Sequence, residues 1–319
     1  LILVVFGAKE VDADKEPEWT YKEPEWTHSF ENYVLATVIS ANGEYVAVSG
    51  WDTKVHLFDS EGTPLWNYST GGAVDSLSIS ADGEYITAGS KDGKVYIFNK
   101  ESSTPLWNYT TVGNYVSVAI SADGEYITAS SFDTNDGSNR ALYLFHKDSS
   151  TPLWQNHTIG GSRLAISSDG EYIFTSLSFS GGLCLFSKDS STALWNYTAV
   201  VGPGNFKIAV EANGEYFFAG NSAGLFLFDK HSTTPLWNYT GIGSASSVSI
   251  SADGRYIVSG GGSDENNFYI LDTDSNTPPW NYTFPEEDYD MGPVTISPNG
   301  EYVITCGNWP HYNFYLFGT

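Results

Sequence analysis

The chain has 319 residues and a formal net charge of −24, and 41% of its residues are hydrophobic and 15% are aromatic. This negative charge repels the phosphates of nucleic acids and anionic lipids, so we expect neither as a partner. The sequence contains no apolar run long enough for a membrane span. Its many aromatic residues and glycines favour short strands over helices.

Residues 1–23 lie outside the repeats described below and begin with an apolar stretch. This stretch consists of Leu1, Ile2, Leu3, Val4, Val5 and Phe6. We interpret residues 1–23 as an N-terminal arm whose apolar strand binds a neighbouring subunit by strand addition. Three alternatives stay open: the strand folds back onto its own domain, it packs below the central channel, or it is the remainder of a signal peptide.

Two sequence blocks recur between residues 24 and 319. The first, ISADGEYI in its clearest form, predicts a strand, a tight turn at Asp-Gly and a second strand. Its glycines are Gly43, Gly83, Gly124, Gly170, Gly214, Gly254 and Gly300, at spacings of 40 to 46 residues. In the second repeat the pattern predicts four strands, at 74–80, 85–90, 94–99 and 106–110. Four strands in about 40 residues are typical of one blade of a β-propeller.

The second block, TPLWNYT in its commonest form, occurs six times, whereas the turn block occurs seven times. A seventh tryptophan lies near the N-terminus, because Trp26 precedes Ile39 by the same 13 residues that separate Trp66 from Ile79. The sequence therefore predicts an all-β fold over residues 24–319. We expect a seven-bladed β-propeller with four antiparallel strands per blade, whose last blade is closed by the N-terminal strand around Trp26. Such closure removes open sheet edges.

The stretch ISADGEYITAGSKDGKVYIF at 79–98 resembles the WD-repeat unit, although Phe98 stands in the place of the WD dipeptide. The overlapping stretch KVYIFNKESSTPLWNYT at 94–110 resembles the tryptophan repeat of pyrroloquinoline-quinone-type propellers, a repeat found in secreted prokaryotic surface proteins. The resemblance implies that a tryptophan on each outer strand packs between neighbouring blades, and we expect the adjacent leucine to pack there too. These tryptophans are Trp26, Trp66, Trp107, Trp154, Trp195, Trp237 and Trp280.

The quinone enzymes with this repeat use two adjacent cysteines, a calcium ion and a catalytic aspartate. Cys184 and Cys306 are 122 residues apart, so the chain lacks the cysteine pair. We therefore predict no cofactor and no enzymatic activity. The stretch Asp133–Asn139 resembles a calcium loop, but its glycine comes one position too early for the EF-hand pattern. Calcium binding by this stretch stays open.

Each of the six tryptophan blocks contains the N-glycosylation sequence Asn-x-Ser/Thr. The acceptor residues are Asn67, Asn108, Asn156, Asn196, Asn238 and Asn281. In the third copy, Asn156 follows Trp154 by two residues instead of one. This shift moves the asparagine to the other face of a strand, yet the triplet is kept, which favours covalent glycans over a simple preference for polar residues. Glycosylation in turn indicates an extracellular or cell-surface location.

Loop lengths vary on one expected face of the propeller, chiefly at 131–140, 261–267, 284–292 and 308–312. Variable loops commonly carry binding functions, and Trp309 and Tyr312 are the best candidates for contacts there. We predict a self-assembling structural component of a surface layer, sheath or filament, a homo-oligomer or polymer in which the arm connects subunits. The alternative is an extracellular binding module that uses the variable face for a protein or carbohydrate partner.

Overall fold

The computed structural model describes residues 30, 32–135, 137–177, 181–198, 206–261, 267–275, 280–283, 291–297, 300, 302–307 and 314–318. Within these ranges the regular structure consists of β-strands. Contacts divide the chain into two compact units, and each is described by itself. The first includes Pro24–Phe179 and Leu185–Leu194, and the second includes Ser180–Cys184 and Trp195–Thr319.

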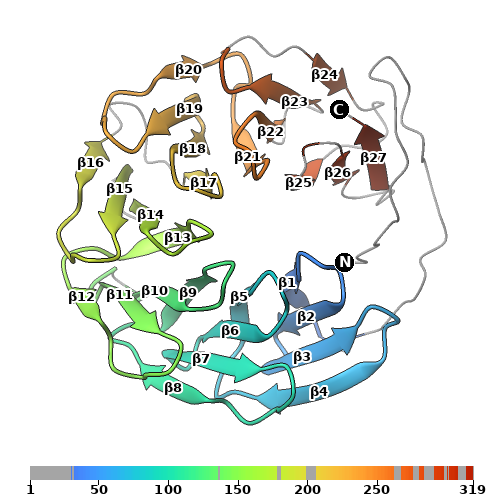
Figure 1. The fold of residues 1–319 in the computed structure, drawn as a ribbon, viewed down its shortest axis with the longest axis vertical. Helices are drawn as coiled ribbons and strands as arrows, with labels where there is room; N and C mark the ends of the chain where they lie inside the picture. The colour runs from blue at the N-terminus through green and yellow to red at the C-terminus, as the bar shows by residue number, and fades with distance from the viewer. Residues whose placement is uncertain are drawn as a thin grey trace. The chain divides into compact units, whose positions relative to one another are not determined.

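The first sheets in chain order are four-stranded and antiparallel (Figure 1). Sheet 1 contains β1 (Val34–Ile39), β2 (Tyr45–Gly50), β3 (Lys54–Asp59) and β4 (Pro64–Ser69). Sheet 2 contains β5 (Val74–Ile79), β6 (Tyr85–Ser90), β7 (Lys94–Asn99) and β8 (Trp107–Thr110). Sheet 3 contains β9 (Tyr115–Ile120), β10 (Tyr126–Phe132), β11 (Ala141–His146) and β12 (Trp154–Asn156). Sheet 4 contains β13 (Gly161–Ile166), β14 (Tyr172–Leu177), β15 (Gly182–Ser187) and β16 (Trp195–Thr198).

The remaining sheets follow the same order of strands. Sheet 5 contains β17 (Lys207–Val210), β18 (Tyr216–Asn221), β19 (Gly224–Asp229) and β20 (Trp237–Tyr239). Sheet 6 contains β21 (Ala245–Ile250), β22 (Tyr256–Gly261), β23 (Asn267–Asp272) and β24 (Trp280–Thr283). Sheet 7 has three described strands, β25 (Met291–Ile296), β26 (Tyr302–Gly307) and β27 (Phe314–Gly318). The strand that we expect around Trp26 lies outside the described residues.

The four strands expected in the second repeat agree with β5 to β8 within one residue. Each strand pairs with the next one in sequence, so every sheet is a meander that runs from its first strand to its last. In the first unit, the first strand of each sheet also contacts that of the next, as β1 contacts β5 and β5 contacts β9.

The hydrophobic core lies between neighbouring sheets. One cluster joins Val55 and Leu57 of sheet 1 to Val74, Ile86 and Phe98 of sheet 2. Equivalent clusters join sheets 2 and 3, sheets 5 and 6, and sheets 6 and 7. Because both faces of the middle strands are covered, these strands are buried along nearly their whole length, unlike the outer strands.

The Ser-Ala-Asp-Gly turn between the first two strands is stabilised in the same way in most sheets. In sheet 2, the Ser80 hydroxyl donates to Asp82 Oδ1 at 2.6 Å, and Asp82 Oδ1 accepts the Glu84 N–H at 2.9 Å. Gly83 has a φ of 73°, a region that glycine adopts without strain. A Cβ at Gly83 would lie 2.4 Å from the ring of Tyr45 in sheet 1, so the turn of one sheet fits against the tyrosine of the preceding sheet.

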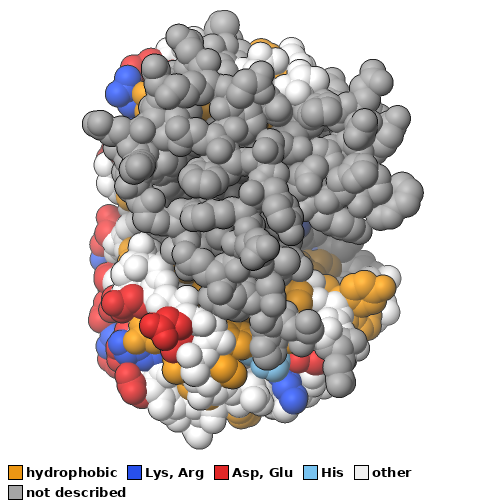
Figure 2. Space-filling view, turned by 90° about the vertical axis from the view of Figure 1, so that its right-hand side faces the viewer, with side chains coloured by type: hydrophobic (Ala, Val, Ile, Leu, Met, Phe, Trp, Pro, Cys, Tyr) orange, Lys and Arg blue, Asp and Glu red, His pale blue; other side chains and the backbone are white. Residues whose placement is uncertain are grey.

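The turns are also joined by backbone hydrogen bonds within the first unit. The N–H of Ala41 donates to the carbonyl of Ala81 at 3.0 Å, that of Ala81 to Ala122 at 2.9 Å, and that of Ala122 to Ser168 at 3.0 Å. Lysines after the third strands pair with glutamates of the same turns, for example Lys100 with Glu84. In Figure 2, acidic and basic side chains accordingly lie side by side along one margin of the described surface.

Candidate functional site

In five of the described outer strands, the tryptophan connects its sheet to the next one. Trp66 packs on Phe98 of sheet 2, with ring centroids 5.3 Å apart, and its Nε1 donates to the carbonyl of Lys100 at 2.7 Å. The same hydrogen bond joins Trp107 to Lys147, Trp154 to Lys188, Trp195 to Lys230 and Trp237 to Thr273. Trp26 lies outside the described residues, as does the side chain of Trp280.

The leucines that precede these tryptophans are exposed, which corrects the expectation that they pack between blades. Their exposed fractions are 43% for Leu65, 52% for Leu106, 54% for Leu153, 51% for Leu194 and 51% for Leu236. The tryptophan takes the inward position on the strand, and the alternation of side chains then directs its neighbour outward.

Five of the six glycosylation acceptors lie on the solvent-exposed side of an outer strand. These are Asn67, Asn108, Asn196, Asn238 and Asn281. In each triplet the serine or threonine two positions later is exposed as well, as in Asn108 and Thr110. Among the strands that the structure describes, each outer strand pairs on one side only, so the acceptor and its hydroxyl residue share an open edge.

Asn156 differs from the other acceptors because it is half-buried, and both ends of its side-chain amide form hydrogen bonds. Its Nδ2 donates to the carbonyl of Ser191 at 2.9 Å. Its Oδ1 accepts the N–H of Thr158 at 2.8 Å and the hydroxyl of Thr158 at 2.7 Å. Asn156 is half-buried, whereas the neighbouring Gln155 is exposed. The displaced triplet of the third repeat therefore has a structural explanation that does not require a glycan.

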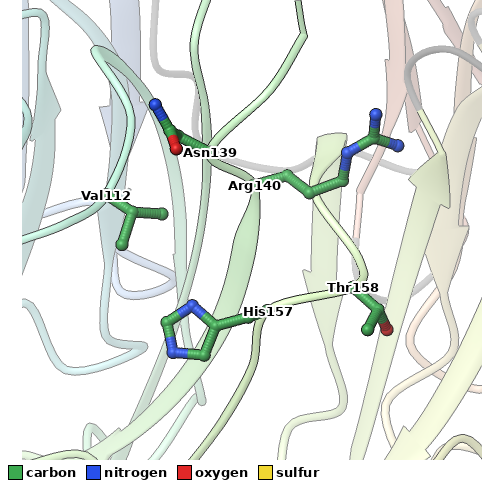
Figure 3. A pocket seen from close by; sticks show the side chains of 5 residues that line it. All are labelled: Val112, Asn139, Arg140, His157 and Thr158. Atoms are coloured by element: carbon green, nitrogen blue, oxygen red, sulfur yellow. The ribbon is translucent and has the colours of Figure 1, made fainter.

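A pocket of 420 Å³ lies beside this displaced triplet, in the first unit. It is lined by Val112, Asn139, Arg140, His157 and Thr158. Val112 follows β8, Asn139 and Arg140 precede β11, and His157 and Thr158 follow β12. In the view of Figure 3, Arg140 and Thr158 extend to one side, and Val112, Asn139 and His157 lie towards the other. These segments belong to the loop face that was expected to vary in length.

The loop between β10 and β11 has a defined conformation around this pocket. Asp133 and Ser138 form a backbone hydrogen bond of 2.9 Å across its base. Thr134 donates through its backbone N–H and its hydroxyl to Asn114 Oδ1, at 2.9 and 3.1 Å. Asn139 has a positive φ of 48°, a conformation that asparagine tolerates better than most residues. The loop therefore presents Asn139 and Arg140 from a fixed turn.

The carboxylate of Asp133, the first residue of the possible calcium loop, binds groups of the loop itself. Asp133 Oδ1 accepts the backbone N–H and the side-chain amide of Asn135 at 2.9 and 2.8 Å. Among the described residues, no cluster of three or more His, Cys, Asp or Glu side chains is arranged to hold a metal ion. Asp136 lies outside the described residues.

Cys184 is a buried free thiol, 1% exposed, in β15. Its Sγ–H donates to Asn196 Oδ1 at 2.9 Å. Burial raises the pKa of this thiol to about 12, so its thiolate is scarce near neutral pH and its reactivity is low. The side chain of Cys306 lies outside the described residues, as do Leu1–Phe6, Trp309 and Tyr312.

A family model described as "Outer membrane protein assembly factor BamB" (PQQ_2) matches residues 18–197, more than half of the chain. The chain belongs to this family of β-propeller repeats. The crystal structure of the β-propeller domain of Cps50 (Swd1) from Myceliophteria thermophila is similar in fold, with a TM-score of 0.69 at 12% sequence identity. The alignment covers 95% of this chain and 99% of that one.

These matches establish a β-propeller fold, and the resemblance to both repeat types is confirmed. No curated protein matches the chain. Within the described part of the chain, the structure contains no helix that could cross a membrane.

Proposed function

We propose that this protein is a non-enzymatic, N-glycosylated β-propeller located outside the cell or on its surface. In this proposal seven blades form a ring that is closed by the strand around Trp26. Residues 1–23 form an arm that connects subunits into a homo-oligomer or polymer, as in a surface layer, sheath or filament. The observation that supports it is the repeated exposure of Asn-x-Ser/Thr on five outer strands.

Exposed outer strands are suitable sites for glycans because they leave room for a bulky, hydrated group. The exposed leucines beside these strands leave apolar surface next to the acceptor residues, and attached sugars would shield it from water. Glycans on the rim would also limit association between sheet edges.

Glycopeptide mapping of the native protein tests the modification. We expect glycans on Asn67, Asn108, Asn196, Asn238 and Asn281, because these side chains are exposed. Asn156 is the internal control: its amide donates to Ser191, so we expect it to be unmodified. An intact mass equal to that of the bare chain would contradict the proposal, and modification of Asn156 alone would contradict the structural argument.

Removal of residues 1–16 tests the arm. We expect the truncated protein to be monomeric in light scattering, because the apolar strand that joins subunits is missing. A matched variant, Val4→Lys with Val5→Lys, keeps the length of the arm but makes strand addition to an apolar site unfavourable, and should dissociate in the same way. An unchanged particle mass in both variants would rule out the connecting role.

The pocket between β8, β11 and β12 favours a second candidate function, that of an extracellular binding module. Its residues come from the loop face that the sequence predicts to be variable. Its volume lies within the range of about 300 to 1,000 Å³ that is usual for small-ligand sites. The two functions are compatible, since a surface component can also bind a ligand.

A further inference from the structure

The exposed leucine and the glycosylation acceptor of an outer strand lie on the same face of that strand. In sheet 2, Leu106 and Asn108 are exposed, whereas Trp107 between them is half-buried. The N–H of Leu106 donates to the carbonyl of Ile97 at 2.8 Å, which keeps the leucine in line with β8. Residues two positions apart along a strand are separated by about 7 Å. A sugar attached to Asn108 therefore starts beside Leu106.

The same pair of residues recurs in several sheets. A single exposed leucine is ordinary on a protein surface, but here an exposed leucine precedes an exposed acceptor by two residues in four of the described sheets. The pairs are Leu65 with Asn67, Leu106 with Asn108, Leu194 with Asn196, and Leu236 with Asn238. The repeat therefore places apolar surface at a fixed position relative to each of these acceptors.

The face that carries this pair is also the face by which a sheet packs on the preceding one. Asn108 lies opposite Tyr96 in the pairing of β7 with β8, and paired residues share one face of a sheet. The ring of Tyr96 is buried and packs on Tyr68 of sheet 1, with centroids 5.8 Å apart. Asn108 therefore lies on the outermost strand, at the outer margin of the contact between sheets 1 and 2.

Sheet 5 repeats this geometry in the second unit. Asn238 lies opposite Phe226 in the pairing of β19 with β20. The ring of Phe226 packs on that of Tyr197 in sheet 4, with centroids 6.2 Å apart. A sugar on Asn238 would thus also start at the outer margin of a contact between two sheets.

We propose that the first sugar of each of these four glycans packs on the leucine two positions before its acceptor and covers the outer margin of the contact with the preceding sheet. This inference rests on the proposed glycosylation and gives the glycans a stabilising contact. A pyranose ring has C–H groups on its faces and hydroxyl groups around its edge, so one face can cover a leucine while the hydroxyls stay in water. Removal of apolar surface from water stabilises the folded protein.

The hydrogen bond of one acceptor is compatible with this contact. The Cys184 thiol donates to Asn196 Oδ1 at 2.9 Å. A glycan is attached through Nδ2, so this bond can persist in the modified protein. It would limit rotation of the Asn196 amide, and with it the directions in which the first sugar can point.

Two repeats separate the leucine from the acceptor and provide internal controls. In sheet 3, Leu153 is exposed, but Gln155 takes the position two residues later and Asn156 is half-buried. In sheet 6, Asn281 is exposed, but the residue two positions earlier in the sequence is Pro279. We therefore expect no contact between a sugar and a leucine in either repeat.

A double-mutant cycle on the glycosylated protein from its native host tests the contact. One variant replaces the four paired leucines by serine, a second replaces their four acceptors by glutamine, and a third combines both sets. We expect each set alone to lower the Tm by about 1 °C per site, and the combined set to lower it no further than the acceptor set alone. Leu153→Ser and Asn281→Gln are the matched controls and should leave the Tm unchanged. Nuclear Overhauser contacts between the Leu106 methyl groups and the first sugar on Asn108 provide a direct readout.

Additive losses from the two sets, or a loss in Leu153→Ser as large as that in Leu106→Ser, would overturn the contact. Glycopeptide mapping of the same samples distinguishes the two ways to fail. Occupied acceptors with additive losses refute the leucine contact alone, whereas unoccupied acceptors in the wild-type protein refute the proposed glycosylation and this inference with it. Loss of glycans from the leucine variant would assign the leucines to recognition by the glycosylating enzyme, and would also overturn the contact.

Discussion

At the scale of single residues, Glu211 is the exception among the turn blocks. The equivalent residue in the other six is serine, whose hydroxyl stabilises the turn in sheet 2. Glu211 is 3% exposed, and its Oε2 accepts the Glu215 N–H at 3.1 Å. Burial raises the pKa of its carboxyl above the ordinary value of 4.5. The residue therefore occupies a position where its charged form is disfavoured.

The raised pKa of Glu211 predicts a dependence of stability on pH. The folded state binds the Glu211 proton more tightly than the unfolded state does. Protonation of Glu211 therefore stabilises the folded protein, and this stabilisation is complete below pH 4.5 and is lost as pH rises through the raised pKa. We expect Glu211→Gln, which keeps the size of the side chain but removes its charge, to raise the Tm at pH 7 by a few degrees and to have little effect at pH 4. Calorimetric scans of both proteins across this range provide the measurement. A wild-type advantage at pH 7 would contradict the prediction.

At the scale of a structural element, the outer strand combines a half-buried tryptophan with an exposed leucine. Trp107 packs on Phe145 and donates to the carbonyl of Lys147 at 2.6 Å, whereas Leu106 is 52% exposed. Two adjacent apolar residues therefore make unequal contributions to stability.

Substitutions at these two positions measure the difference. We expect Trp107→Ala to reduce the free energy of unfolding by about 3 to 5 kcal/mol because it leaves a cavity between sheets. Trp107→Phe should cost about 1 kcal/mol or more, through loss of the indole hydrogen bond. Leu106→Ala should change stability by less than about 0.5 kcal/mol. Urea denaturation of the three variants tests this, and similar losses at both positions would show that the leucine is buried in solution.

The sequence patterns predicted the strands well, but the candidate site only in part. Asp-Gly turns and alternating apolar residues locate β5 to β7 because these signals are local. Hydropathy alone could not reveal that Leu106 is exposed, because Leu106 and Trp107 are both apolar and only one of two adjacent strand residues can face the next sheet. The pocket was missed because Arg140 and His157 are 17 residues apart in the sequence, and only the pairing of β11 with β12, in which Leu142 lies opposite Asn156, brings them together. The available signal was that the long loop at 131–140 and the displaced triplet belong to the same repeat.

At the scale of the whole molecule, the proposed ring closure gives Trp26 the same structural role as Trp107. We expect Trp26→Ala to lower the free energy of unfolding by as much as Trp107→Ala, about 3 to 5 kcal/mol, since both indoles would fill a gap between blades. Removal of residues 1–16 should leave stability unchanged, because it spares the closing strand. Chemical denaturation of these variants tests closure separately from assembly. A Trp26→Ala protein as stable as wild type would contradict it.

The contact between each Asp-Gly turn and the tyrosine of the preceding sheet has a practical consequence for protein engineering. Gly83, Gly124 and Gly170 leave no space for a side chain beside Tyr45, Tyr85 and Tyr126, so a foreign peptide grafted into these turns would separate the sheets. The hairpin between β10 and β11 already accommodates extra residues. An epitope or affinity tag intended for display on this scaffold therefore belongs at the opposite end of the strands from the Asp-Gly turns.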